Sequence, residues 1–331
     1  MNECQKKPAR KSTKKTAADG MVAEVLEGNT RAIAKMMSRA EAGFGESHTA
    51  MAEIYRHAGN AHVIGITGVP GSGKSTLVCA LAQAFRASGR RVGIIAVDPS
   101  SLFSGGAILG DCVRMGDLAT DDGTFVRSMA TCGALGGLAR ASLDTVDILD
   151  AAGFDVVMVE TVGIGQDEVD IAEAAHTIVV VSAPGLGDEV QAIKAGVLEI
   201  ADIHVVSKAD KSDAQETASN LQSMLALGLS GKNRFGWQVV VLLSSAQKGD
   251  GIAELAASID KHFQHLQDTG ELSLRRRRIL ETRIVKTVED TVRSRITADC
   301  EQQLDSQLDR AETRDIGPQA AAQQLIQNLK I

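Results

Sequence analysis

Aromatic residues are scarce in this sequence. They make up 3% of its 331 residues, with one Trp and one Tyr. Proteins that bind single-stranded nucleic acid stack the bases on aromatic side chains, and this chain offers few of them. The formal net charge is -7, so the chain also lacks the positive field that attracts a phosphate backbone. We therefore expect no nucleic-acid partner.

Paired cysteines and long apolar runs are absent as well. The five cysteines are dispersed without a C-x-x-C pair, which is typical of a reducing compartment rather than of a disulfide framework. No apolar run approaches the ~20 residues that span a bilayer. The N-terminus lacks the apolar middle of a secretory signal. These absences predict a cytoplasmic protein that has no membrane partner.

Glycine, in contrast, is abundant, and one glycine-rich stretch carries the clearest chemistry. Residues 63–76 have the sequence VIGITGVPGSGKST. The apolar run Val63–Ile66 predicts a buried strand, and the residues after it match G-x-x-x-x-G-K-[ST] at every fixed position. This pattern predicts a phosphate-binding loop whose backbone N–H groups, together with the N-terminus of a helix starting near Lys74, face a polyphosphate.

Two side chains of this loop have predicted roles of their own. Lys74 is expected to reach the β- and γ-phosphates, and Ser75 is expected to place its hydroxyl on Mg²⁺. The predicted nucleotide-binding residues of the loop are Gly68, Val69, Pro70, Gly71, Ser72, Gly73, Lys74, Ser75 and Thr76.

Apolar strands alternate with helical stretches through the middle of the chain. Further strands are expected at Val92–Val97, Phe125–Met129, Val156–Val159, Ile178–Val181, His204–Val206 and Val239–Leu243. Helices are expected over 75–88, 138–152, 189–200, 214–227 and 252–265. The alternation predicts an α/β fold with a mostly parallel central sheet flanked by helices, and with ligands at the carboxyl ends of its strands.

Composition divides the chain into four predicted parts. Residues 1–18 are basic and polar and are expected to be a disordered tail, with a transit peptide as the alternative. Residues 19–60 are expected to form an N-terminal helical extension, in which a break near residues 28–30 separates two helices. Residues 61–268 form the predicted nucleotide-binding domain.

The fourth part, residues 269–331, is expected to be a C-terminal helical extension for dimerisation. It begins with the arginine run 275–278, which we interpret as a solvated or interface helix start rather than as a nucleic-acid site. Pro318 is expected to open the last short helix.

An acidic residue follows a buried strand downstream of the phosphate loop. Glu160 lies at the end of the strand that starts at Val156, three residues before Gly163. This E-x-x-G pattern predicts that Glu160 holds Mg²⁺, through water, and that the N–H of Gly163 meets the third phosphate. The alternative is an exposed carboxylate at a strand end.

Nucleotide identity depends on two later motifs. Ser207-Lys208-Ala209-Asp210 follows an apolar strand and corresponds to [N/T]-K-x-D, in which the carboxylate accepts from the guanine base and the lysine stem covers its face. Ser207 is shorter than the usual Asn, which normally ties this loop to the phosphate loop, so we expect reduced affinity. Ser245 and Ala246 match the loop whose Ala N–H meets the guanine O6. Together these motifs predict GTP and GDP as ligands.

Several further segments resemble one family from about residue 20 to the C-terminus. They are VDPSS at 97–101, GGAILGD at 105–111, LGGLAR at 135–140, ETVGIGQ at 160–166 and PGLGDEVQ at 184–191. With the phosphate loop, these motifs are similar to those of the MeaB/ArgK/MMAA family, the methylmalonyl-CoA mutase-associated GTPases. The resemblance implies a P-loop NTPase fold of the SIMIBI type.

The resemblance also implies roles for individual residues. Asp98 and Asp111 join Ser75 and Glu160 near Mg²⁺, and Asp111 belongs to the first switch. The implied catalytic residues are Lys74, Glu160, Asp111 and Gly163. A third switch that contacts the mutase is implied at Asp188, Glu189, Gln191 and Lys194. Cys112-Val113 departs from the family pattern after Asp111.

What the resemblance implies about function is a homodimeric, GTP-hydrolysing metallochaperone. It would gate cofactor loading and removal, and so protect an adenosylcobalamin-dependent acyl-CoA mutase. The sequence has no D-x-H-x-x-G cobalamin signature of its own. No Gln directly follows Gly163, so we expect slow intrinsic hydrolysis that the mutase stimulates.

Three other functions compete with this one. A nickel-inserting maturation GTPase would carry Cys/His clusters, whereas the only close pair here is His262 and His265, for which a surface or core role is favoured. A kinase is disfavoured by Asp210 and Ala246. A nucleotide-dependent scaffold that does not hydrolyse its ligand stays open.

Overall fold

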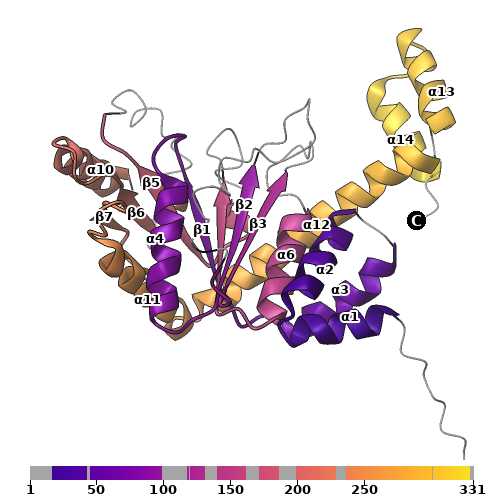
Figure 1. Ribbon diagram of the computed structural model, residues 1–331. Coiled ribbons are helices and arrows are strands. Elements are labelled where there is room, and N and C mark those ends of the chain that lie inside the picture. The colour runs from indigo at the N-terminus through magenta and orange to yellow at the C-terminus, as the bar shows by residue number, and fades with distance from the viewer. Residues whose placement is uncertain are drawn as a thin grey trace, which may run out of the picture. The chain divides into compact units, whose positions relative to one another are not determined.

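The computed structural model describes residues 17–42, 45–98, 118, 120–130, 140–161, 171–185, 199–228, 236–299 and 301–328. A seven-stranded sheet lies at its centre, with the strand order β3-β2-β4-β1-β5-β6-β7 (Figure 1). The strands are β1 (His62–Gly68), β2 (Val92–Asp98), β3 (Thr124–Ala130), β4 (Val156–Thr161), β5 (Thr177–Ser182), β6 (Ile203–Val206) and β7 (Val240–Leu243). Every neighbouring pair is parallel, which confirms the predicted α/β fold.

Helices cover both faces of the sheet (Figure 1). On one face, α4 (Lys74–Ala87) and α11 (Ile252–Asp268) share an apolar core with β1. On the other face lie α6 (Arg140–Ala151), the short helix η1 (Ile171–Glu173) and α10 (Ala214–Gly228). The helix predicted over 189–200 lies outside the described residues, apart from its last two positions.

Three N-terminal helices pack onto α6 and share its core. They are α1 (Ala17–Leu26), α2 (Thr30–Ala42) and α3 (Gly45–His57). Asn29 lies at the predicted break, where its side-chain oxygen accepts from the backbone N–H groups of Arg31 and Ala32 at 3.0 and 3.1 Å and caps α2. Met36 and Met37 are completely buried, so the methionines of this stretch belong to the core.

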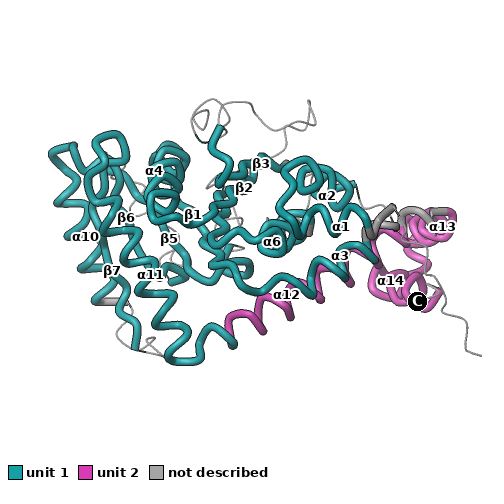
Figure 2. Tube along the Cα trace, turned by 60° about the horizontal axis from the view of Figure 1, so that its bottom comes forward, with its two compact units in different colours: residues 1–273 teal, residues 274–331 magenta. Residues whose placement is uncertain are grey.

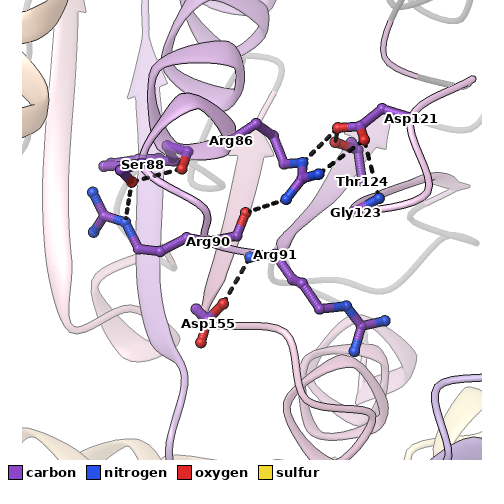
Figure 3. A network of polar contacts seen from close by, with 9 residues as sticks. Arg86, Ser88, Arg90, Arg91, Asp121, Gly123, Thr124 and Asp155 are labelled. Carbon is purple, nitrogen blue, oxygen red and sulfur yellow. Dashed lines mark hydrogen bonds and ion pairs between the residues drawn. The ribbon is translucent and has the colours of Figure 1, made fainter.

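A polar network fixes the amino ends of three strands (Figure 3). Arg86, in the last turn of α4, forms a forked ion pair with Asp121 and donates to the carbonyl of Arg90 at 2.7 Å. Asp121 also accepts from the Gly123 N–H, just before β3. The backbone N–H of Arg91, before β2, donates to Asp155, before β4, at 2.7 Å. Arg86 holds the pKa of the Asp121 carboxyl well below its usual value, so this ion pair persists across the neutral range.

The chain divides into two compact units, residues 1–273 and 274–331 (Figure 2). Helix α12 (Glu271–Asp299) begins in the first unit, and the second unit contains the rest of it with α13 (Glu301–Glu312) and α14 (Pro318–Asn328). Pro318 opens the last helix, as predicted. Within the described ranges, none of the helices combines the length and the apolar character that a membrane crossing requires.

Candidate nucleotide site

The loop between β1 and α4 passes very close to the neighbouring strand β5. Gly68 ends β1 with φ at +136°, and a Cβ atom at this position would lie 2.0 Å from the carbonyl oxygen of Val181. Gly71 and Gly73 also have positive φ, at +75° and +93°. Only glycine adopts such angles at little cost and allows so close an approach. The glycines of the motif therefore set the path of the loop.

The first turn of α4 opens onto this loop. Gly73 is the N-cap residue and has no side chain that could occupy the N–H groups of the turn. Lys74 is 6% exposed, and its Nζ donates to the carbonyl oxygens of Gly68 and Val69 at 2.8 and 3.0 Å. The ammonium is thus held inside the curve of the loop, next to the positive end of the helix.

Glu160 lies beside this turn because β4 is the neighbour of β1. Its backbone pairs with Ile66 of β1 and with Ala96 of β2. Its Oε1 accepts a hydrogen bond from Ser75 Oγ at 2.7 Å, in a buried position. The predicted magnesium ligands Ser75 and Glu160 are therefore adjacent, and Asp98 ends β2 one position beyond the pair Val97–Thr161.

These residues fit a magnesium ion by the chemistry of their donors. A hydroxyl oxygen and a carboxylate oxygen within hydrogen-bond distance are the hard ligands that Mg²⁺ takes, together with water and substrate phosphates. In the part of the chain that is described, no three His, Cys, Asp or Glu side chains form a metal-binding group.

A cavity of about 760 Å³ lies over the loop at the carboxyl ends of the strands. Pro70, Lys74, Ser75 and Glu160 line one part of it, and Lys208 and Gln247 line another. Residues from the phosphate loop, the E-x-x-G strand and both predicted base loops thus share one cavity.

The loop after β6 is fastened to the phosphate loop by two side chains. Ser207 Oγ is within hydrogen-bond distance of the carbonyl oxygens of Ser72 and, at 3.0 Å, Ser182. Lys208 adopts a positive φ of +53° and donates from Nζ to the carbonyl oxygen of Gly71 at 2.7 Å. The short side chain at 207 therefore keeps the tie that we expected it to weaken, and its effect on affinity stays a prediction.

The two predicted base loops lie side by side. Ser245 Oγ donates to Asp210 Oδ1 at 2.9 Å, and the Ala209 N–H donates to the Ser244 carbonyl at 3.0 Å. The hydrogen bond from Ser245 lowers the pKa of the Asp210 carboxyl, so this group is an anion at neutral pH. The fixed carboxylate of Asp210 can accept hydrogen bonds from the edge of a base, and the backbone N–H of Ala246 can donate one to it.

Six predicted site residues lie outside the described residues. They are Asp111, Gly163, Asp188, Glu189, Gln191 and Lys194. Conversely, the motifs did not single out Thr161 and Gln247, which line the cavity. Each follows a motif residue, Glu160 and Ala246 respectively, and that adjacency is the signal that could have identified them.

Comparison with known proteins defines the family. The family model described as "Methylmalonyl Co-A mutase-associated GTPase MeaB" matches residues 30–301. A putative GTPase of Pyrococcus horikoshii is 41% identical over 311 residues, which cover 94% of this chain and 98% of that protein. The mitochondrial methylmalonic aciduria type A homolog of Mus musculus is 37% identical over 216 residues, covering 64% of this chain and 52% of the mouse protein.

The fold is shared with a solved structure of similar length. The crystal structure of an LAO/AO transport system kinase superposes with a TM-score of 0.69 at 25% identity, covering 95% of this chain and 98% of that one. The family match spans the sheet, the phosphate loop and the helices on either side of them. This chain therefore belongs to the MeaB family of methylmalonyl-CoA mutase-associated GTPases and is itself a GTPase.

Proposed function

We propose that the chain binds GTP with Mg²⁺ in the cavity over the phosphate loop. The loop N–H groups and the first turn of α4 hold the phosphates, and Lys74 places its charge on the β- and γ-oxygens. Asp210 accepts from the guanine base, Ala246 donates to it, and the stem of Lys208 covers it. Two observations support this assignment. Lys74 and Lys208 line one cavity, and Asp210 is hydrogen-bonded to Ser245, two residues before Gln247, which lines the same cavity.

Ser75, Glu160, Asp98 and Asp111 are the proposed residues around Mg²⁺. When bound, the ion supplies positive charge that offsets the charge of the phosphates. The protein's own contribution to hydrolysis is the ammonium of Lys74 and the helix N-terminus, which are in place before negative charge develops. Gly163 is the proposed contact of the third phosphate.

The proposed cellular role is that of a chaperone for an adenosylcobalamin-dependent acyl-CoA mutase. In this proposal, GTP binding and hydrolysis gate loading and removal of the mutase cofactor. The observation that carries it is the match to a mutase-associated GTPase family over residues 30–301, well beyond the nucleotide-binding strands. The name of the mouse relative, a methylmalonic aciduria type A homolog, agrees with such a partner. We propose that the chain acts as a homodimer in the cytoplasm.

This role requires the binding of GTP and the binding of the mutase to affect each other. If GTP changes the affinity for the mutase, the mutase must change the affinity for GTP by the same factor. We propose that the mutase is contacted by the third switch, which contains Asp188, Glu189, Gln191 and Lys194. Substituting Asp188 or Lys194 by Ala should leave basal GTP binding intact and weaken the response to the mutase.

Two measurements test this role: capture of protein partners and the rate of GTP hydrolysis. The tagged chain is used to capture partners in the presence of GDP or of a GTP analogue that is not hydrolysed, and GTP turnover is measured with purified methylmalonyl-CoA mutase. We expect nucleotide-dependent capture of a cobalamin mutase and faster turnover in its presence. The Lys74→Ala variant should hydrolyse no GTP in either condition. Turnover that the mutase leaves unchanged, with no mutase captured, would refute the chaperone role while leaving the GTPase assignment intact.

A further inference from the structure

Two buried threonines join the strands that carry the phosphate loop and Glu160. Thr67 precedes Gly68 in β1, and Thr161 follows Glu160 in β4. Their exposed fractions are 0% and 1%, and their hydroxyl oxygens are 2.9 Å apart. This hydrogen bond lies where both strands reach the proposed nucleotide.

The pair has one more hydrogen than it uses. Two hydroxyls carry two hydrogens, and only one hydrogen can lie between the two oxygens. In the described part of the chain, neither hydroxyl has another hydrogen-bond partner. A buried hydroxyl that donates to nothing is destabilising, so the second hydrogen calls for an acceptor.

The cavity indicates where that acceptor would be. Thr161 lines the cavity, together with Lys74, Ser75 and Glu160, whereas Thr67 is not among the described residues that line it. The hydroxyl of Thr161 now donates to Thr67. If an anion occupied the cavity, Thr161 could turn its hydrogen to that anion, and Thr67 could donate to Thr161 in its place. Both hydrogens would then be used, and a hydrogen bond to an ionised oxygen is stronger than one between hydroxyls.

We propose that Thr161 is a specificity-determining residue, whose hydroxyl donates to the third phosphate of GTP with Thr67 as the donor behind it. The inference rests on the proposed nucleotide site. The third phosphate is chosen because Thr161 lies between Glu160 and the proposed γ-phosphate contact Gly163, at the end of β4. Thr161 would thus distinguish a nucleoside triphosphate from a diphosphate.

Nucleotide affinities of matched variants test the proposal. Calorimetry compares GDP with guanosine 5′-[β,γ-imido]triphosphate on the full chain. Thr161→Val keeps the shape of the side chain and removes the hydroxyl, so it should weaken binding of the triphosphate analogue about 10-fold and leave GDP affinity within about 2-fold. Thr161→Ser restores the hydroxyl and should recover the preference for the analogue. Thr161→Ala serves as a second hydroxyl-free variant should the valine variant not fold.

Thr145→Val is the matched control. Thr145 is also fully buried, but its hydroxyl donates to the Ala141 carbonyl within α6 at 2.8 Å, so this variant should change neither affinity. Equal loss of GDP and analogue affinity in the hydroxyl-free variants, or no loss of either, would overturn the proposal while the GTP site stands. Failure of the unmodified chain to bind either GDP or the analogue would instead refute the proposed site itself.

Discussion

Asp210 is the residue on which guanine recognition depends in the proposed site. Its carboxylate is fixed by the hydroxyl of Ser245 and is ionised at neutral pH because that hydrogen bond lowers its pKa. Replacing it with Ala leaves the donors of the guanine base unpaired. We expect Asp210→Ala to bind GTP about 10- to 100-fold more weakly. Calorimetry with GTP and ATP measures the change.

The matched control for this prediction is Asp213→Ala. Asp213 belongs to the same loop, and its carboxylate lies near Gly185 rather than at Ser245. This variant should keep the preference for GTP. If the unmodified chain bound ATP as tightly as GTP, the base loops would have been assigned wrongly.

Individual residues could be predicted from the sequence only where a motif fixes them. Lys74, Ser75 and Glu160 lie together as their motifs predicted. The contact of Ser207 with the Ser72 carbonyl could not be predicted, because it depends on how closely two loops approach in space. For the same reason the sequence indicated only the pair His262 and His265. In the fold, the rings of His62 and His176 stack on Phe263, which lies between that pair in α11.

At the level of elements, the junction of β1 and β5 limits what the phosphate loop tolerates. A Cβ at position 68 would lie 2.0 Å from a backbone oxygen of β5, so Gly68→Ala must force the two strands apart. We expect a loss of at least about 3 kcal/mol in the free energy of unfolding. Urea unfolding monitored by circular dichroism measures it.

Gly71→Ala is a close control for this change. Gly71 also has a positive φ, of +75°, but a Cβ there meets no atom within 4 Å. Only the conformational cost of about 1–2 kcal/mol is expected. Equal stabilities of the two variants would show that close approach to β5 does not matter.

Backbone pairing with neighbouring strands explains why the ends of β1 and β4 were predicted too short. The apolar run of β1 ends at Ile66, but the strand continues through Thr67 and Gly68, which pair with Val180 and Val181 of β5. The apolar run of β4 ends at Val159, but that strand continues through Glu160 and Thr161, which pair with β2. Backbone pairing does not depend on side-chain hydropathy, so the apolar pattern could not reveal it. The strand order likewise depends on contacts between distant segments, whereas the parallel α/β class followed from the alternation of strands and helices.

A buried polar chain connects α11 to the amino ends of β1 and β5. His62 Nε2 is 2.7 Å from Thr177 Oγ1, which is 2.9 Å from His262 Nδ1, and His262 Nε2 lies 3.3 Å from Asp202. The ring of His62 also stacks on Phe263 at 4.0 Å between centroids. These polar contacts therefore hold β1, β5 and α11 together at the end of the sheet opposite the phosphate loop.

The buried His62 in this set of contacts should make the free energy of unfolding depend on pH. Burial lowers the pKa of His62 well below its usual value, and the nearby His176, His262 and Arg90 lower it further, while Asp202 opposes them. As the pH falls below about 6.5, the unfolded chain binds a proton at His62 that the folded chain excludes. The free energy of unfolding should then decrease by up to about 1.4 kcal/mol per pH unit, until the pH reaches the folded-state pKa.

Urea unfolding between about pH 7.5 and pH 5.5 measures this dependence. The His62→Gln side chain cannot take up a proton, so the free energy of unfolding of this variant should fall less steeply as the pH decreases. His57→Gln makes the same replacement at an exposed position outside this network and serves as the control for the substitution itself. A His62→Gln variant with an unchanged slope would assign the acid sensitivity to another group.

At the scale of the whole molecule, the apolar side chains of α12 bear on the proposed homodimer. Leu274, Leu280, Ile284, Val285 and Val288 are 39–56% exposed, although they lie in a helix with many charged residues. Leu280, Ile284 and Val288 are four residues apart and follow one face of the helix. Apolar side chains arranged on one face of a helix are typical of a surface that another helix covers.

Replacing Ile284 and Val288 with Glu should dissociate the proposed dimer. Covering each of these side chains contributes about 1.5–3 kcal/mol, so their loss, together with the charge introduced, should weaken self-association by at least about 100-fold. Light scattering over a range of protein concentrations measures the mass. Asp290→Lys is the control, because position 290 lies about 200° round the helix from Val288 and should leave the mass unchanged. GTP affinity should persist in both variants, since the proposed binding residues belong to the first unit. A double variant that keeps the mass of the unmodified chain would exclude this face of α12 as the dimer contact.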